Sequence, residues 1–224
     1  MHQTERIEDL QEALRTVFEG SQAGLWTAMP GIVQSFNAAR GTCVIQPAVK
    51  ARIQAADGSF SWQPMFPLPD VKVVFLGCGN LVLTFEPQPG DEALVIFSSR
   101  CLDGWWQQGG VQIPPEIRMH DLSDGFAIIG PRSQAKLIQN ISPNAQLRTL
   151  DGSAYYELTP AGVANIVAPG GVNINGVAID VHGNVSTPGK VTATGEGTFN
   201  TIEVSQHEHT GVTPGSGTTG PPVG

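Results

Sequence analysis

Two histidines near the end of the sequence carry its most distinctive chemistry. They lie in residues 205–224, which read SQHEHTGVTPGSGTTGPPVG. His207 and His209 are separated by one residue, so in an extended strand both imidazoles project from the same face. No Cys, His, Asp or Glu follows Glu208 and His209, so one copy of this segment cannot fill a tetrahedral or octahedral metal shell. Three copies around a three-fold axis would supply six nitrogen ligands.

The same segment has a simpler interpretation. A terminus rich in Gly, Thr and Pro with an isolated H-x-H pattern is also typical of a disordered tail. The choice between a metal site and a tail depends on the elements that precede the two histidines.

The composition favours a β-rich protein that does not bind nucleic acid. Of the 224 residues only 14% are charged and 7% are aromatic, whereas there are 27 Gly and 17 Pro. This balance favours turns and short strands over helices. The formal net charge of -8 argues against binding nucleic acid or anionic lipid through bulk electrostatics.

The cysteines and the hydropathy pattern bear on the compartment of synthesis. Cys43, Cys78 and Cys101 are odd in number and lack C-x-x-C spacing, which predicts buried, reduced thiols rather than a disulfide framework. The sequence shows no apolar run of about 18 residues and no signal peptide. We therefore expect a soluble product made in the cytoplasm.

Residues 4–19 are predicted to form the one clear helix. Thr4 is suited to cap its start and Gly20 to end it. The apolar positions at helical spacing are Ile7, Leu10, Leu14 and Val17, with Ala13 and Phe18 widening the stripe. About two heptads are too short to hold a coiled coil alone, so the stripe must dock on the next domain or on a partner subunit.

Between residues 25 and 130 the apolar pattern changes to period two in short runs. The predicted strands are 31–37, 42–51, 60–64, 71–76, 81–85, 93–97 and 126–129. Turn sequences rich in Gly, Asp and Pro separate them. This arrangement predicts a small closed barrel of OB type, with a sandwich as the alternative. The basic groove that oligonucleotide binding needs is missing.

Three segments of this region carry a family resemblance. They read PGDEALVIF (89–97), RCLDGWWQQGG (100–110) and HDLSDGFAIIG (120–130), the last being the most specific. They resemble the N-terminal OB domain of central spike proteins from contractile phage tails. In that family the domain lies at the base of a trimeric, membrane-piercing spike. The resemblance implies a homotrimer, a baseplate hub protein and the host outer membrane as partners, and a place in the virion tail baseplate after synthesis in the host cytoplasm.

Two groups of side chains in this region have competing interpretations. Trp105 and Trp106 lie in a predicted polar loop, where they either pack over a barrel end or contact a subunit or the hub. His120, Asp121 and Asp124 could be taken for a catalytic or metal-binding group. The sequence around them, Asp-Leu-Ser-Asp-Gly, is instead typical of turn and capping chemistry before the strand 126–129.

Beyond residue 132 short alternating apolar sets continue almost to the end of the chain. They are Val172/Ile174, Val177/Ile179/Val181, Val191/Ala193 and Ile202/Val204, with His182 in an exposed turn between them. Each set is too small to cover a core within one chain, whereas strands of three copies wound together could bury their inner faces. We therefore expect an intertwined, trimeric β-helix or β-prism, with a monomeric hairpin-rich β domain as the alternative.

Four segments follow from these patterns. They are an N-terminal helix (1–23), an OB-fold domain (24–132), a trimeric β-helical shaft (133–204) and an apex with the H-x-H metal site (205–224). In a trimer, His207 and His209 would face the axis and present six neutral imidazoles to a divalent transition ion. The resemblance to spikes that end in H-x-H favours Fe(II), one per trimer, whereas ligand type alone leaves nickel, cobalt and zinc open. Other structural ions are compatible with the chain. No coordination position is left for catalysis.

The expected function is that of a structural central spike that sheath contraction drives through the host outer membrane, and not that of an enzyme. Two alternatives remain. A cell-wall-degrading module would need a positioned pair of carboxylates in a cleft, and the chain has no inserted domain large enough to build one. The carboxylates available for such a pair are Glu86, Asp91, Glu92, Asp121 and Asp124. A tail-associated glycan-binding module would stack sugars on Trp105 and Trp106.

Overall fold

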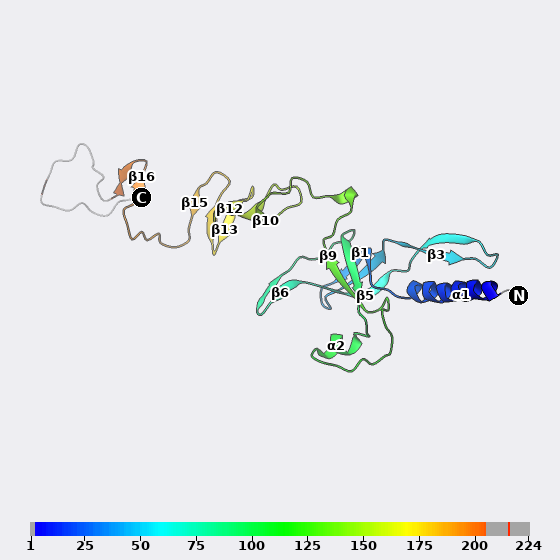
Figure 1. Ribbon diagram of the computed structural model, residues 1–224. Coiled ribbons are helices and arrows are strands. Elements are labelled where there is room, and N and C mark those ends of the chain that lie inside the picture. Colours follow the sequence, from blue (N-terminus) through cyan, green and yellow to red (C-terminus); the bar gives the residue numbers. More distant parts are fainter. Residues whose placement is uncertain (1–2, 205–214, 216–224) are drawn as a thin grey trace. The chain divides into compact units, whose positions relative to one another are not determined.

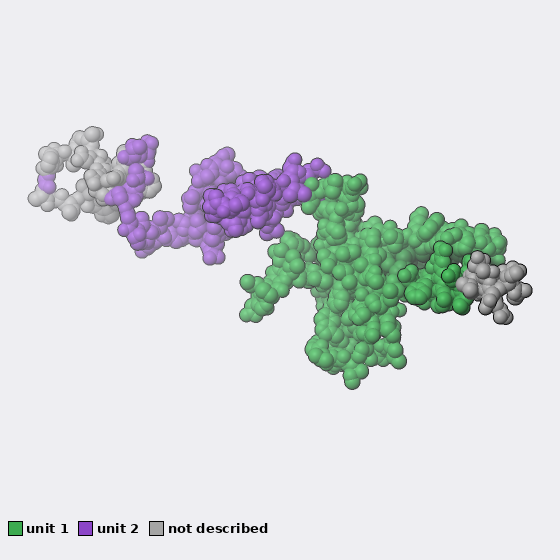
Figure 2. All heavy atoms as spheres, viewed as in Figure 1, with its two compact units in different colours: residues 1–138 green, residues 139–224 purple. Residues whose placement is uncertain are grey.

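The computed structural model describes residues 3–204 and residue 215. The chain divides into two compact units, residues 1–138 and 139–224, shown in different colours in Figure 2. The fold is mainly β, with one N-terminal helix and a five-stranded barrel, as predicted (Figure 1). None of the helices in the described residues is long and apolar enough to cross a membrane.

Helix α1 spans Gln3–Ala23 and is longer than predicted at its C-terminal end. Thr4 lies within the helix rather than at the position before it, and the helix continues through Gly20 to Ala23. A single Gly costs only about 1 kcal/mol relative to Ala within a helix, which the neighbouring helical residues outweigh. The apolar stripe is uncovered, since its four large described side chains are 54–70% exposed: Leu10, Leu14, Val17 and Phe18.

Five strands close into the barrel of the first unit. They are β1 (Ala28–Asn37), β2 (Thr42–Pro47), β5 (Leu68–Val73), β8 (Glu92–Phe97) and β9 (Gly125–Ile129). Their order around the barrel is β1-β2-β5-β9-β8, and only the β5–β9 pair is parallel. Counting barrel strands alone, the third pairs with the fifth, which is the arrangement of an OB-type barrel. The predicted closed barrel is confirmed, and the sandwich alternative is wrong.

Strict alternation along these strands places one side of each in the core. In β8, Ala93, Val95 and Phe97 are buried while their neighbours are partly or fully exposed. The remaining buried members of the core are Met29, Val33, Cys43, Ile45, Leu68, Val71 and Ala127. Gly31 is needed where β1 passes β2, because a Cβ at this position would overlap the Ile45 side chain.

Two hairpins interrupt the barrel strands, where longer strands were predicted. β3 (Lys50–Gln54) pairs with β4 (Phe60–Pro64), and β6 (Leu76–Cys78) pairs with β7 (Leu81–Leu83). The predicted strand 42–51 is therefore split after Pro47, which has no N–H to continue a ladder. The predicted strand 71–76 is split after Val73.

The connection between β8 and β9 contains a second helix, and a short 3-10 helix follows the barrel. Helix α2 spans Asp103–Gln108, so the segment predicted as a polar loop around Trp105 and Trp106 is partly helical. The 3-10 helix η1 spans Gln134–Lys136. Cys43 and Cys101 are buried and unpaired as predicted, whereas Cys78 in β6 is exposed, contrary to the prediction.

The second unit consists of small antiparallel sheets made by consecutive strands of one chain. The first sheet contains β10 (Ala145–Arg148), β11 (Tyr155–Leu158) and β12 (Ala164–Val167). The second contains β13 (Val172–Ile174), β14 (Val177–Ile179) and β15 (Val185–Ser186). The last pair is β16 (Thr198–Phe199) with β17 (Ile202–Glu203).

The sets Val172/Ile174 and Val177/Ile179 lie in strands as predicted, whereas Val181 lies in the turn after β14 and Val204 lies just after β17. Val191 and Ala193 also lie outside the strands, in an irregular segment whose Gly residues are unfavourable in strands. His182 lies in an exposed turn, as expected. His207 and His209, and the predicted apex apart from Gly215, lie outside the described residues.

Candidate functional site

Arg118 organises the connection between β8 and β9. Its Nε donates to Oδ2 of Asp124 at 2.7 Å, and its Nη2 donates to Oδ1 of Asp124 at 3.1 Å and to Asp103 at 2.7 Å. Its Nη1 donates to Glu116 at 2.6 Å. Asp124 is fully buried, and its Oδ1 also accepts the backbone N–H of Leu102 at 2.8 Å. One guanidinium therefore ties the start of α2 to the turn that precedes β9.

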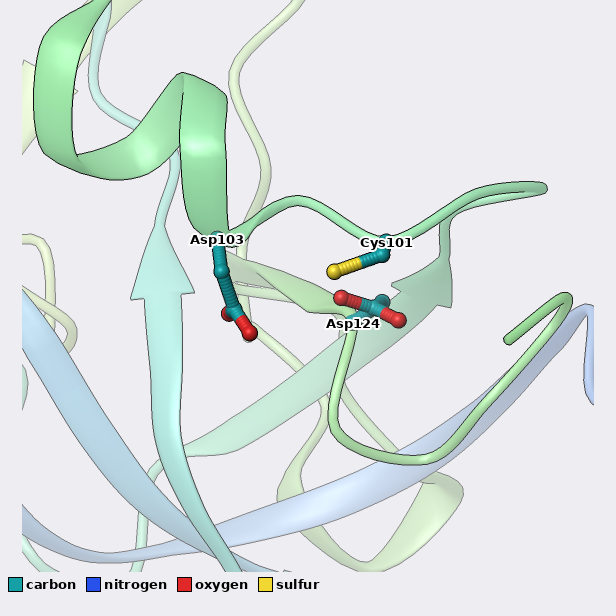
Figure 3. Close-up of side chains that lie close together, drawn as sticks. All are labelled: Cys101, Asp103 and Asp124. Atoms are coloured by element: carbon teal, nitrogen blue, oxygen red, sulfur yellow. The ribbon is translucent and has the colours of Figure 1, made fainter. Parts of the chain in front are cut away.

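Cys101, Asp103 and Asp124 bring potential metal ligands together in the same place. Their ligand atoms lie within 4.8 Å of one another, and the three side chains converge from the loop before α2, the start of α2 and the turn before β9 (Figure 3). The carboxylates of both aspartates are already bound by Arg118. A divalent ion would have to displace that guanidinium, so the cluster is an ion-paired anchor for the loop.

The electrostatics of the cluster agree with this interpretation. The hydrogen bond from Arg118 is the main reason that the pKa of Asp103 lies below its usual value. Hydrogen bonds to Asp124 and, to a smaller extent, to Asp103 raise the pKa of the Arg118 guanidinium, which stabilises its charged form. Asp103 and Arg118 are therefore both charged at neutral pH.

The predicted turn chemistry around Asp121 is present. Oδ1 of Asp121 accepts hydrogen bonds from both the backbone N–H and the hydroxyl of Ser123, and these bonds lower the pKa of Asp121. His120 has a left-handed backbone (φ 49°), and its buried Nδ1 has no hydrogen-bond partner among the described residues. Asp124 is more than a turn residue, because it is the buried anchor for Arg118. Sequence reasoning missed Arg118, and the only available signal was an arginine six residues before an aspartate.

The two tryptophans of α2 pack on the outside of the barrel. The Trp105 ring lies edge-on to Phe126 of β9, with centroids 5.7 Å apart, and remains 43% exposed. The ammonium of Lys72 in β5 lies 5.8 Å from the centroid of the Trp106 ring. This packing supports the first of the two interpretations, a tryptophan pair against the barrel. A contact with a hub or a sugar stays a prediction.

One face of the first sheet in the second unit carries a row of polar side chains that hydrogen-bond to one another. Gln146, Glu157 and Asn165 stand opposite one another on β10, β11 and β12. The buried carboxylate of Glu157 accepts hydrogen bonds from Gln146 at 2.7 Å and Asn165 at 3.1 Å. It also accepts a hydrogen bond from Ser142 at 3.2 Å. These hydrogen bonds lower the pKa of Glu157, and the one from Asn165 has the largest effect.

The opposite face of this sheet is apolar and uncovered. It carries Leu147, Tyr156, Leu158 and Ile166, which are 50–54% exposed. Alternation along each strand separates these side chains from the polar row. We call these four residues the first apolar face.

The next sheet repeats the design. Val172 stands opposite Ile179, which stands opposite Val185, and Ile174 stands opposite Val177. These five residues form the second apolar face. Ile174 and Val185 are 58% and 66% exposed. Asn173, Ala178 and Ser186 occupy the other side. Two successive sheets therefore present an apolar face that the described residues of the chain leave open.

Comparison with known proteins bears on the first unit. No curated protein matches the chain. Residues 29–130 match the family model described as the phage protein Gp138 N-terminal domain. The matched span covers less than half of the chain and runs from the second residue of β1 to just past β9. This barrel is thus similar to a phage protein domain, which supports a phage tail or baseplate type of protein with a structural role in the virion.

Proposed function

We propose that this chain is the central spike of a contractile phage tail baseplate, a homotrimer that pierces the host outer membrane when the sheath contracts. The observation that carries the proposal is the pair of apolar faces on successive sheets of the second unit. The similarity of the barrel to a phage protein domain supplies the biological setting.

The apolar faces call for partners of the same kind. Sheets of three strands, each with two to four residues, are too small to be stable alone while their apolar side faces water. Each Å² of apolar surface removed from water contributes about 25 cal/mol. Three copies that turn these faces toward a common axis would bury all of them and leave the polar sides outside. The second unit would then form the shaft as a trimeric β-helix or β-prism.

Such a shaft suits a mechanical role rather than catalysis. Interlocked chains unfold only when all three separate, so resistance to force is set by a high kinetic barrier. Strand edges paired between chains also remove the sites at which exposed sheets aggregate. The OB-type barrel would attach the trimer to the baseplate hub, and the energy of penetration would come from the sheath.

His207 and His209 would form the metal site at the tip. Six neutral imidazoles from three chains suit a divalent transition ion such as Fe(II). We expect tag-free protein to contain one transition-metal ion per three chains when metal content and molar mass are measured on the same sample, by plasma mass spectrometry and light scattering. A His207→Ala/His209→Ala variant should lose the metal and remain a trimer, because the two apolar faces are unchanged.

Two results would contradict this proposal in different ways. A metal-free trimer would remove the histidine site and leave the shaft. A monomer would remove the spike itself, because neither the apolar faces nor the histidines would have partners.

A further inference from the structure

The β3–β4 hairpin forms an arm with one cationic and aromatic face. Register places Arg52 opposite Trp62 and Gln54 opposite Phe60, so these side chains share a face with Lys50. Phe60 and Trp62 are 54% and 64% exposed. The Arg52 guanidinium lies 3.8 Å from the centroid of the Phe60 ring. We call this hairpin the arm and this surface its aromatic face.

An apolar pocket with three acidic lining residues lies elsewhere on the same unit. Its volume is about 580 Å³, and the β6–β7 hairpin forms part of its wall. The large apolar lining side chains include Val73, Leu76, Leu83, Phe85, Ile128 and Ile129. Leu76 stands opposite Leu83, and Cys78 stands opposite Leu81, so all four share the hairpin face that lines the pocket. We call this cavity the hairpin pocket.

The acidic residues of this pocket are complementary in charge to the basic residues of the arm. Glu86, Asp91 and Glu92 line it, against a single basic lining residue, Arg132. Hydrogen bonds from the backbone N–H and the hydroxyl of Ser133 lower the pKa of Glu92, so its carboxylate is charged at neutral pH. An occupant that combines large apolar side chains with positive charge fits this lining, and the aromatic face of the arm has both.

Topology prevents the arm from filling the pocket of its own chain and favours a neighbouring copy. The arm directly precedes β5 (Leu68–Val73) in the chain, and the β6–β7 hairpin directly follows it (Figure 1). Six residues of strand span roughly 20 Å, so the two hairpins belong to opposite ends of β5. A contact between unlike surfaces on opposite sides of a subunit is heterologous, and such contacts form a closed ring when the rotation from one copy to the next closes, as it does in a trimer with three-fold symmetry.

We propose that the arm of one copy docks its aromatic face into the hairpin pocket of the next copy, around the ring of three. The inference rests on the proposed homotrimer and adds a specific interface at the level of the barrels. Trp62 and Phe60 insert among the apolar lining residues, while Arg52 and Lys50 face the acidic lining residues. Each barrel then gives one arm and receives one.

Cross-linking between an introduced and a native cysteine tests this contact. Gln54→Cys places a thiol on the aromatic face, and exposed Cys78 lies on the pocket face of the β6–β7 hairpin, while Cys43 and Cys101 are buried. With a short bismaleimide, the expected main product on a denaturing gel is a covalent trimer. A head-to-tail ring links all three chains, whereas a two-fold contact would link only pairs.

Three matched variants define the contact. Gln63→Cys carries its thiol on the other face of the arm and should cross-link poorly, and Cys78→Ser in the Gln54→Cys background should abolish the product. Phe60→Ala/Trp62→Ala in the same background should reduce the covalent trimer at least about tenfold, because a tenfold change corresponds to about 1.4 kcal/mol and buried aromatic anchors usually contribute more.

Light scattering on the uncross-linked sample separates the possible failures. Trimeric protein that yields no covalent trimer, or only covalent dimers, would overturn the arm contact and leave the spike intact. Monomeric protein would overturn both the contact and the proposed function.

Discussion

Replacing Ile174 with Asp is expected to prevent the chain from assembling into trimers. Ile174 is 58% exposed in the single chain and belongs to the second apolar face, next to Val177 on the neighbouring strand. In a trimer three copies of the side chain would be buried together. Each substitution removes about 1.5–3 kcal/mol of apolar burial and adds a carboxylate that must be desolvated beside two like charges. The sum over three chains exceeds what short strands can compensate.

Asn173→Asp is the matched control for this prediction. Asn173 is adjacent in sequence but lies on the opposite, exposed side of the strand. Its side-chain oxygen accepts the backbone N–H of Gly176 at 3.0 Å, and an aspartate retains that acceptor. Both variants introduce one negative charge per chain, so only the face differs. We expect the control to elute and scatter light as a trimer.

Size-exclusion chromatography with light scattering distinguishes the two faces. The expected result is monomer or aggregate for Ile174→Asp and trimer for Asn173→Asp at the same concentration. A trimeric Ile174→Asp protein would show that the second apolar face is not buried between chains, and the proposed shaft would lose its main support. Failure of both variants would point to charge itself and would contradict the assignment of faces.

The sequence predicted well those features that depend on local alternation. The barrel strand predicted over residues 93–97 forms within β8 (Glu92–Phe97), where Ala93, Val95 and Phe97 alternate into the core. The sets Val172/Ile174 and Val177/Ile179 likewise fall on one face of β13 and β14. In both places the local pattern of apolar side chains is sufficient to predict a strand from a single sequence.

Features set by contacts distant in sequence were missed. Nothing in the composition of residues 100–124 shows that Arg118 reaches Asp103, because that pairing depends on how the whole connection folds over the barrel.

Two other errors have local causes. The division of the predicted strand 42–51 has a local signal in the sequence, because Pro47 cannot donate a ladder hydrogen bond. Cys78 is predicted to be buried because free cysteines usually are, but it lies in a hairpin that projects apolar side chains outward.

Arg118→Met is expected to destabilise the barrel by about 3–5 kcal/mol at neutral pH, since removing one partner of a buried ion pair leaves an uncompensated charge. Asp124 would keep the Leu102 N–H as a partner but would lose both hydrogen bonds from the guanidinium. Urea unfolding followed by tryptophan fluorescence measures the effect, because all four tryptophans lie between residues 26 and 106. An Arg118→Met/Asp124→Asn variant should recover part of the lost stability, because it also removes the unpaired buried carboxylate.

Arg15→Met supplies the control, and pH supplies an independent signature. Arg15 pairs with Glu19 on α1 with both side chains mostly exposed, so the loss of this pair should cost less than about 1 kcal/mol.

The pKa of Asp103 is lowered by Arg118, so the contribution of this ion pair to stability is fully present above the ordinary aspartate pKa of 3.8. It is lost as pH falls through the lower pKa of Asp103 in the folded protein. Arg118→Met abolishes that pKa shift, so the stability gap to the parent protein should narrow as acid is added. A gap that stays constant down to acid unfolding would mean that Arg118 acts through packing of its side-chain stem rather than through its charge.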